Sequence, residues 1–167
     1  MNNSLYFNFY SGVSGDMLIG SLISLGVEID ILKKTLSKID KSLSIKTKDV
    51  SRGLNSCKLV EPLIPKSLDK SYSWDELKKF IEYIKDEDFV YKNSIETIEL
   101  IEECESEVHE SEITNPHELG NFDTVFDIVC FYKCIEILKI EKLYHSGIPY
   151  SQGEIKISHG NVSSLAP

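Results

Sequence analysis

Two aspartates near the middle of the chain are spaced so that they could hold a cation. Asp123 and Asp127 are four residues apart in the stretch HELGNFDTVFDIV, residues 117 to 129. In a helix both carboxylates share one face, where they repel each other by about 0.2–0.5 kcal/mol, and by more when buried. His117 and Glu118 come just before them. A divalent ion between carboxylates and an imidazole would remove the repulsion, and this ligand set suits nickel, zinc or cobalt.

A structural role for the same two carboxylates is also consistent with the pattern. Asp123 would fall near a helix N-terminus, where the helix dipole favours anions. Asp127 could face water, and perturbed carboxylates are often purely structural. Because the spacing matches no standard metal motif, the sequence supports both the metal-binding and the structural interpretation.

A second candidate site lies in YSGVSGDMLIG, residues 10 to 20, where a predicted strand ends and a helix begins. Backbone N–H groups at such a helix start can bind an anion. The pattern therefore predicts a phosphate or cofactor site at Gly12, Ser14, Gly15 and Asp16. The alternative is a plain tight turn with a serine cap. Asp16 would repel a phosphate unless a cation bridges the two.

A third candidate is His159, in ISHGNV near the end of the chain. A single histidine at the end of a strand is more often structural than a metal ligand, and both interpretations stay open. No residue pattern identifies a catalytic acid, base or nucleophile, so the catalytic residues are unknown at this stage.

Composition limits the classes of protein that the chain can belong to. The 167 residues, 41% of them hydrophobic, are enough for one domain with a real core. The formal net charge is -9, and the absence of a basic patch argues against nucleic-acid binding. No apolar run reaches the roughly 20 residues of a membrane span. Four cysteines without a CxxC pair or an export signal indicate a reducing cytoplasm.

Hydrophobic periodicity and turn residues predict the order of the elements. Helices are expected at residues 14–26, 28–40, 73–86, 87–110 and 121–138, with Ser73 and Glu76 forming a capping box at the third of these. Strands are expected at 5–11, as a pair within 43–64, and as two short strands within 142–160, with Pro62 and Pro65 breaking regular structure. This order predicts an α+β fold class, a mixed α/β domain whose short strands form a sheet packed against several helices.

Three segments taken together resemble a known family. They are FYSGVSGDMLIGSLISLGV near the start, VHESEITNPHELGNFDTVFDIV in the middle and GIPYSQGEIKISHGNVSSLAP at the end. In this order they are similar to the LarC-type nickel insertion family, which matures the nickel-pincer cofactor of lactate racemase. The SGxSGDM block and the HE-x-G-x-x-D-[ST]-x-x-D block are specific when they occur together.

The resemblance implies a cytoplasmic cyclometallase of the lyase class. Such enzymes insert Ni²⁺ into a pyridinium mononucleotide precursor that bears two thiocarboxylates. They consume CTP, with Mg²⁺ or Mn²⁺ in the full-length family. By matching position, the family's conspicuous polar residues fall on Asp16, His117, Glu118, Asp123, Asp127 and His159. The last five are the predicted metal ligands.

The chain departs from the family pattern in three ways. Asn115, Pro116, His117 and Glu118 stand where members usually carry His-x-His-Glu, so one imidazole is missing. Residues 61–74 lack the histidines that many members carry in this region. Members also continue beyond the point that corresponds to Pro167. Residues 1–167 are therefore expected to be a single domain that corresponds to the N-terminal part of the family.

Two functions follow from the resemblance. The first is the N-terminal domain of the nickel-insertion cyclometallase. The second is a non-catalytic metal-binding or scaffold module that acts with a separate C-terminal domain or subunit. A homo-oligomer is compatible with either function. Neither function involves nucleic acid or a membrane.

Overall fold

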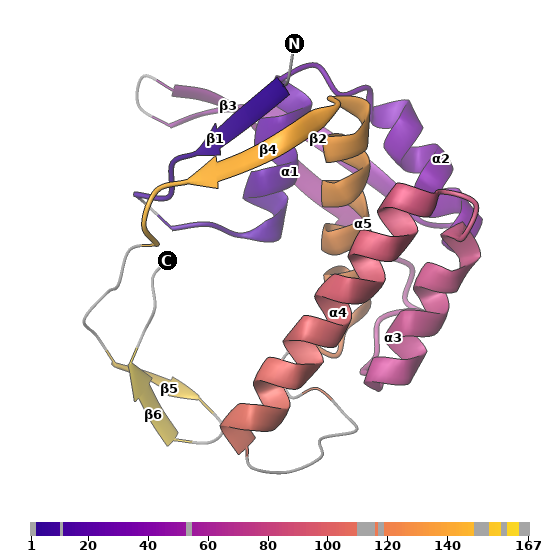
Figure 1. Cartoon of the computed structure of the whole chain (residues 1–167), viewed down its shortest axis with the longest axis vertical. Coiled ribbons are helices and arrows are strands. Elements are labelled where there is room, and N and C mark those ends of the chain that lie inside the picture. Colours follow the sequence, from indigo (N-terminus) through magenta and orange to yellow (C-terminus); the bar gives the residue numbers. More distant parts are fainter. Residues whose placement is uncertain are drawn as a thin grey trace. The chain divides into compact units, whose positions relative to one another are not determined.

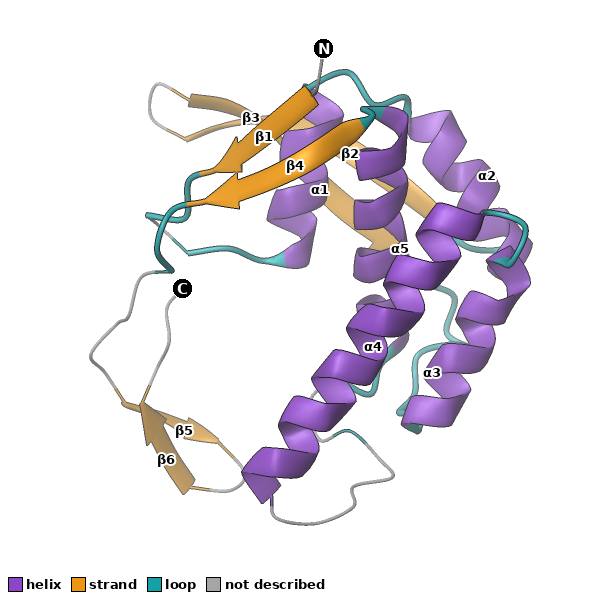
Figure 2. Ribbon diagram, viewed as in Figure 1, coloured by secondary structure: helices purple, strands orange, loops and turns teal. Residues whose placement is uncertain are grey.

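The computed structural model describes residues 3–10, 12–52, 55–109, 116, 119–148, 154–157 and 160–163. Contacts divide the chain into two compact units, one of Met1–Ser14 with Lys139–Pro167 and one of Gly15–Leu138. The α+β class is confirmed: helices accompany short strands, which pair as three two-stranded sheets in the described residues (Figures 1 and 2). The assignment of residues 1–167 to a single domain stays a prediction.

The first unit contains strands from both ends of the sequence. β1 (Asn3–Phe7) pairs in parallel with β4 (Ile140–His145), and Tyr6 lies beside Tyr144 in the register. These two tyrosines are 62% and 50% exposed. β5 (Glu154–Ile157) and β6 (Gly160–Ser163) form an antiparallel pair. The prediction of two strands within 142–160 was wrong in detail, because β4 pairs with the distant β1 and the later hairpin supplies two further strands.

The second unit holds a β-ribbon that supports its first helix. β2 (Ser44–Arg52) and β3 (Asn55–Leu63) are antiparallel, and α1 (Gly15–Ser24) packs against β3. A Cβ at Gly20 would overlap the carbonyl oxygen of Lys58, so glycine allows this close approach. The prediction that Pro62 breaks regular structure was wrong, because Pro62 lies within β3 opposite Ile45. A proline is tolerated there because a strand of a two-stranded ribbon has an unpaired edge.

The remaining helices occur where the sequence predicts them. They are α2 (Ile29–Ile39), α3 (Trp74–Ile81) followed by the short 3-10 helix η1 (Glu82–Ile84), α4 (Asp88–His109) and α5 (Phe122–Ile137). The capping box is confirmed, since the Ser73 side chain accepts from the Glu76 N–H and the Glu76 carboxylate accepts from the Ser73 N–H. The largest fully buried side chains include Trp74, Phe122, Phe126, Ile19, Leu22, Leu32 and Leu36. They form one apolar core in this unit.

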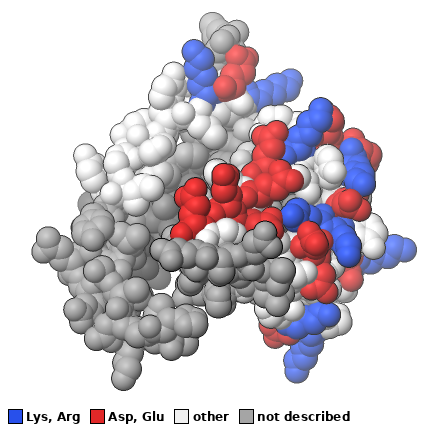
Figure 3. Space-filling view, turned by 60° about the horizontal axis from the view of Figure 1, so that its bottom comes forward, with Lys and Arg blue, Asp and Glu red and all other residues white. Residues whose placement is uncertain are grey.

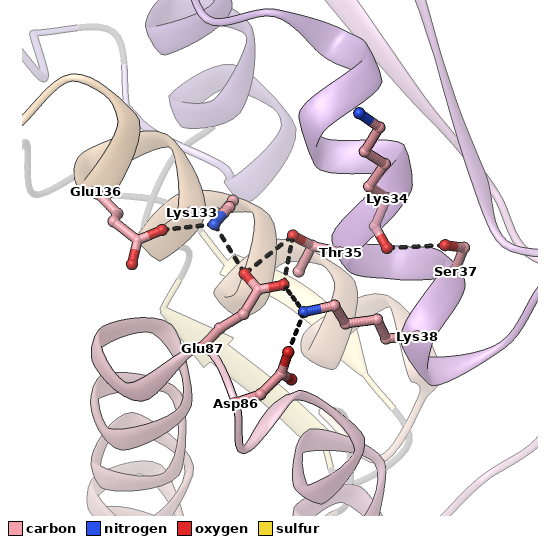
Figure 4. A network of polar contacts seen from close by, with 8 residues as sticks. All are labelled: Lys34, Thr35, Ser37, Lys38, Asp86, Glu87, Lys133 and Glu136. Atoms are coloured by element: carbon pink, nitrogen blue, oxygen red, sulfur yellow. Dashed lines mark hydrogen bonds and ion pairs between the residues drawn. The ribbon is translucent and has the colours of Figure 1, made fainter.

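A largely buried glutamate joins three helices of the second unit (Figure 4). Glu87 precedes α4, and its carboxylate lies 2.8 Å from the Lys133 ammonium of α5 and 2.6 Å from the Lys38 ammonium of α2. It also accepts from the Thr35 hydroxyl at 3.1 Å. Burial raises the pKa of Glu87, but its hydrogen bonds with Lys133 and Lys38 outweigh burial, so the pKa is lowered. This network fixes α5 against α2 and the start of α4.

The distribution of charged side chains on the surface agrees with the acidic composition of the chain. In Figure 3 acidic side chains gather near the centre of the face shown, whereas acidic and basic side chains alternate along its right-hand side. No helix among the described residues combines the length and apolar composition that a membrane span requires.

Candidate functional site

The N-terminal turns of α1 and α5 each carry an aspartate. Asp16 lies in the first turn of α1, and Asp123 lies in the first turn of α5. The two helices pack against each other. Asn121 fixes the start of α5, because its side chain accepts a hydrogen bond from the Thr124 N–H at 3.3 Å. Both carboxylates therefore lie where the helix dipoles favour negative charge.

Asp127 lies one turn further along α5 and faces the start of α1. A Cβ placed on Gly15 would overlap the side chain of Asp127 from its Cβ to its carboxylate. Glycine at position 15 therefore lets the first turn of α1 approach the Asp127 carboxylate directly. The structural alternative in which Asp127 faces water is met only in part, because its side chain is half-buried against this turn.

The three carboxylates act on one another electrostatically. Burial raises the pKa of Asp127 to about 7, and the charges of Asp123 and Asp16 add to this effect. Burial also raises the pKa of Asp123, with Asp16 as the second cause. A cation close to all three would reverse the electrostatic part of these shifts. Asp16, Asp123 and Asp127 are called the carboxylate cluster below.

The Asp127 charge should make the protein less stable at high pH. Its carboxyl has an ordinary pKa of 3.8 and a folded pKa of about 7. The folded state thus binds more protons between these values, and the free energy of unfolding falls as the pH rises through them. Asp127→Asn removes the charge and should raise the melting temperature at pH 8 by roughly 5 °C, which corresponds to a gain on the order of 2 kcal/mol in the free energy of unfolding. Below pH 4 the wild type and Asp127→Asn should have the same melting temperature.

Thermal melts at pH 4 and pH 8 test this expectation. The exposed Asp75, in the first turn of α3, offers the same substitution away from the carboxylate cluster. Asp75→Asn should change the melting temperature little at either pH. If Asp127→Asn and the wild type have the same melting temperature at pH 8, the expectation that the Asp127 charge is buried is contradicted.

The carboxylate cluster is not a complete metal site by itself. In the described residues no group of three or more histidine, cysteine, aspartate or glutamate side chains is arranged to hold a metal ion. The other predicted ligands, His117, Glu118 and His159, lie outside the described residues. Their part in the predicted site stays a prediction. Of the predicted ligands, the structure brings together Asp123 and Asp127, with Asp16 beside them.

The predicted anion site is only partly described. Gly12 has a φ of 85° and closes a turn, donating its N–H to the Phe9 carbonyl at 2.9 Å. Ser14 directly precedes α1, in the N-cap position that the sequence predicts. The boundary between the two units falls between Ser14 and Gly15. Anion binding at Gly12, Ser14, Gly15 and Asp16 therefore stays a prediction.

Two buried thiols follow Asp127 along α5. Cys130 and Cys134 are free and buried. Burial raises the pKa of the Cys130 thiol well above its usual range, with Cys134 and then Asp127 as further causes. Burial also raises the pKa of Cys134 to about 12. Both thiols therefore stay protonated near neutral pH and act as small apolar side chains.

Sequence reasoning missed a pocket that shares one member of the carboxylate cluster. Asp123 lines a cavity of about 270 Å³ together with Asp69, from the loop between β3 and α3. Asp69 lies in the segment KSLDK, which has no periodicity and matches no motif. Only the folded chain brings this loop to the start of α5, so no local signal could have identified it.

Comparison with known proteins identifies relatives along nearly the whole chain. The family model described as nickel insertion protein matches residues 5–167. A relative from Archaeoglobus fulgidus, named for nickel insertion, is 34% identical over 92% of this chain and 39% of its own length. The pyridinium-3,5-bisthiocarboxylic acid mononucleotide nickel insertion protein of Acetivibrio thermocellus is 26% identical over 98% of this chain and 43% of its own length.

A third relative has the same pyridinium compound in its name. The pyridinium-3,5-bisthiocarboxylic acid mononucleotide nickel insertion protein of Staphylococcus saprophyticus is 26% identical over 100% of this chain and 43% of its own length. The chain therefore spans less than half the length of these curated relatives. No solved structure matches it.

Proposed function

Because this chain belongs to the nickel insertion protein family, we propose that it is the N-terminal domain of a nickel-insertion cyclometallase. Its substrates are Ni²⁺ and the pyridinium bisthiocarboxylate mononucleotide from which the lactate racemase cofactor is made. The names of the relatives from Acetivibrio thermocellus and Staphylococcus saprophyticus support this substrate.

The observation that carries the proposal is the carboxylate cluster. Three acidic side chains lie in the first turn of α1 and the first two turns of α5, and burial raises the pKa of Asp127 to about 7. Keeping such charges together costs free energy unless a cation neutralises them. Carboxylate oxygens bind Ni²⁺ but hold it less firmly than thiolates or several imidazoles would. Such a site is suited to a metal that must be passed on to a substrate.

His117, Glu118 and His159 are proposed to complete the ligand set. His117 and Glu118 lie a few residues before Asn121, which starts the helix that carries Asp123 and Asp127. A neutral imidazole ligates and a protonated ring does not, so nickel affinity should fall as the pH drops through about 6.5. Protonation of Asp127, whose folded pKa is about 7, acts in the same direction.

Calorimetric titration with Ni²⁺ tests the proposed metal role. Asp127→Asn and His117→Ala should each weaken binding at least tenfold, since each removes one ligand. Asp75→Asn makes the same charge change on the exposed start of α3 and should bind as the wild type does. Equal nickel affinity for the wild type, Asp127→Asn and His117→Ala would refute the metal role of this site.

The CTP-dependent step is proposed to need sequence beyond this domain. The chain contains no Gly-Lys-Ser/Thr loop of the Walker type. We therefore expect the purified chain, loaded with Ni²⁺ and supplied with Mg²⁺ or Mn²⁺, to release no pyrophosphate from CTP. A pyrophosphate assay measures this directly, and a release rate above the protein-free control would contradict it.

The second candidate function is the scaffold form of the non-catalytic module, which acts with a separate C-terminal domain or subunit. The observation favouring it is the incomplete metal site, because in the described residues no group of three or more potential ligands is arranged to hold a metal ion. Mixing the chain with the part of the Acetivibrio thermocellus relative that it does not cover separates the two candidates. Nickel insertion that needs nickel bound by this chain, and is lost with Asp127→Asn, supports a domain of the enzyme. Insertion unaffected by Asp127→Asn supports the scaffold.

A further inference from the structure

A pocket opens next to the carboxylate cluster within the second unit. Its volume is about 270 Å³, which is large enough for a six-membered ring with small substituents. It lies between the end of β3, the loop that follows, and the start of α5. Its walls are formed by Pro62, Ile64, Leu68, Asp69, Asn121, Phe122 and Asp123. Asp123 belongs to both the pocket and the carboxylate cluster.

Hydrogen bonds hold the walls of this pocket together. The Tyr72 N–H donates to the Gly120 carbonyl at 2.7 Å, which joins the loop after β3 to the lead-in of α5. The Tyr72 hydroxyl donates to the Leu68 carbonyl at 3.2 Å, and the Leu68 N–H donates to the Pro65 carbonyl at 2.9 Å. The pocket is therefore preformed and does not depend on a ligand to close it.

Aromatic packing supports Phe122, one of the residues that line the pocket. The Phe80 ring meets the rings of Tyr72 and Phe122 edge to face, each with centroids 5.0 Å apart. Phe122 is 1% exposed and forms part of the pocket wall. Edge-to-face contacts fix ring orientation as well as burying apolar area. This packing therefore holds Phe122 in place in the pocket wall.

Two carboxylates and apolar side chains line the same pocket. Asp69 and Asp123 carry the negative charge, while Pro62, Ile64 and Leu68 supply the apolar surface. Lys70 follows Asp69 in sequence, but its ammonium lies 5.0 Å above the Tyr72 ring and it is not part of the pocket lining. Hydrogen bonds from Ser73 lower the pKa of Glu76, on α3, and the charge of Lys70 is a smaller cause of this shift. No cation from the described residues lines the pocket.

This lining selects among classes of ligand. The two full charges of Asp69 and Asp123 would repel a small anion more strongly than the partial positive charge at the start of α5 attracts it. A neutral apolar molecule would desolvate both carboxylates without compensation. A hydrated metal ion would gain nothing from the apolar wall. A flat ring that carries a positive charge satisfies both parts of the lining.

We propose that this pocket binds the cationic pyridinium ring of the substrate, with Asp69 facing the ring charge and Asp123 placed between ring and nickel. This inference rests on the proposed function, since it names where the organic substrate lies in that same site. Asp69 is then a binding residue that determines specificity for a charged ring.

Nicotinamide mononucleotide and its reduced form make a matched pair of probes. Both carry the same ribose and phosphate, but the oxidised ring is a flat cation and the reduced dihydropyridine ring is neutral. Titration without nickel, followed by amide NMR shifts, should show the oxidised probe binding at least threefold more tightly to the wild type. The shifts should centre on the pocket residues around Leu68 and Asn121.

Two variants test the role of the pocket. Asp69→Asn should remove most of the preference for the oxidised probe, because it keeps the side-chain size and removes the charge. Asp75→Asn should keep that preference. Leu68→Trp should weaken both probes by filling the pocket, and a melting temperature near that of the wild type would show that the fold is intact.

The outcomes separate this inference from the proposed function. Equal binding of the two probes by the wild type, or an unchanged preference in Asp69→Asn, overturns the pocket assignment. If nickel still binds through Asp127 in that case, the proposed metal role survives. If the oxidised probe is preferred through Asp69 while nickel affinity is insensitive to Asp127→Asn, the pocket stands and the metal role fails.

Discussion

Replacing Gly15 with alanine is expected to destabilise the protein by about 1–3 kcal/mol and to disturb the carboxylate cluster. The added Cβ would overlap the Asp127 side chain from its Cβ to its carboxylate. Because the Asp127 Cβ is close to the α5 backbone, a change of side-chain rotamer cannot fully relieve the overlap. The first turn of α1 must then move away from α5. We therefore expect nickel affinity to fall at least tenfold, measured by calorimetry beside urea unfolding.

A double-mutant cycle separates this contact from a general effect on the helix. Asp127→Ala removes the carboxylate that the added Cβ of Gly15→Ala would overlap. The double variant should therefore be more stable than the sum of the two single changes predicts. If the two changes in the free energy of unfolding simply add, Gly15 does not act through Asp127.

Replacing Glu87 with glutamine should cost about 2–4 kcal/mol in the free energy of unfolding. Glu87 is 11% exposed at its side chain and Lys133 is 14% exposed, so the lysine would lose a charge partner in a poorly hydrated place. The folded pKa of Glu87 is lowered from its ordinary value of 4.5. Its contribution is therefore fully present above pH 4.5 and lost as the pH falls through the folded pKa. Urea unfolding at pH 7 and pH 3 measures both.

Glu136→Gln is the control for this prediction. Glu136 also pairs with Lys133, at 2.5 Å, but its side chain is 35% exposed. Removing its charge should cost less than about 1 kcal/mol. Equal losses for Glu87→Gln and Glu136→Gln at pH 7 would show that the network does not depend on the buried position of Glu87.

Local features of the fold could be predicted from the sequence. The capping box at Ser73 and Glu76 uses residues three apart, and the amphipathic periodicity of α2 and α3 follows from neighbouring residues. Interactions over such short distances depend little on the rest of the chain. For the same reason the presence of two aspartates on one face of α5 was correctly predicted.

Features that depend on distant contacts could not be predicted. The parallel pairing of β1 with β4 joins the two ends of the sequence, and Glu87 meets Thr35 across 52 positions. The raised pKa of Asp127 depends on the approach of Gly15, which reads in the sequence as an ordinary turn glycine. Periodicity carries no information on such pairings, because they arise from packing between elements.

The position of bound Ni²⁺ is the most direct test of the account, and amide NMR can measure it because Ni²⁺ is paramagnetic. Substoichiometric Ni²⁺ should broaden the amide signals around Gly15 and Asp123, at the starts of α1 and α5. Signals around Lys38, in the Glu87 network, should stay sharp. Asp123→Asn combined with Asp127→Asn should abolish the local broadening. Broadening centred on the glutamates of α4, or unchanged in that double variant, would contradict the proposal that the carboxylate cluster receives the nickel.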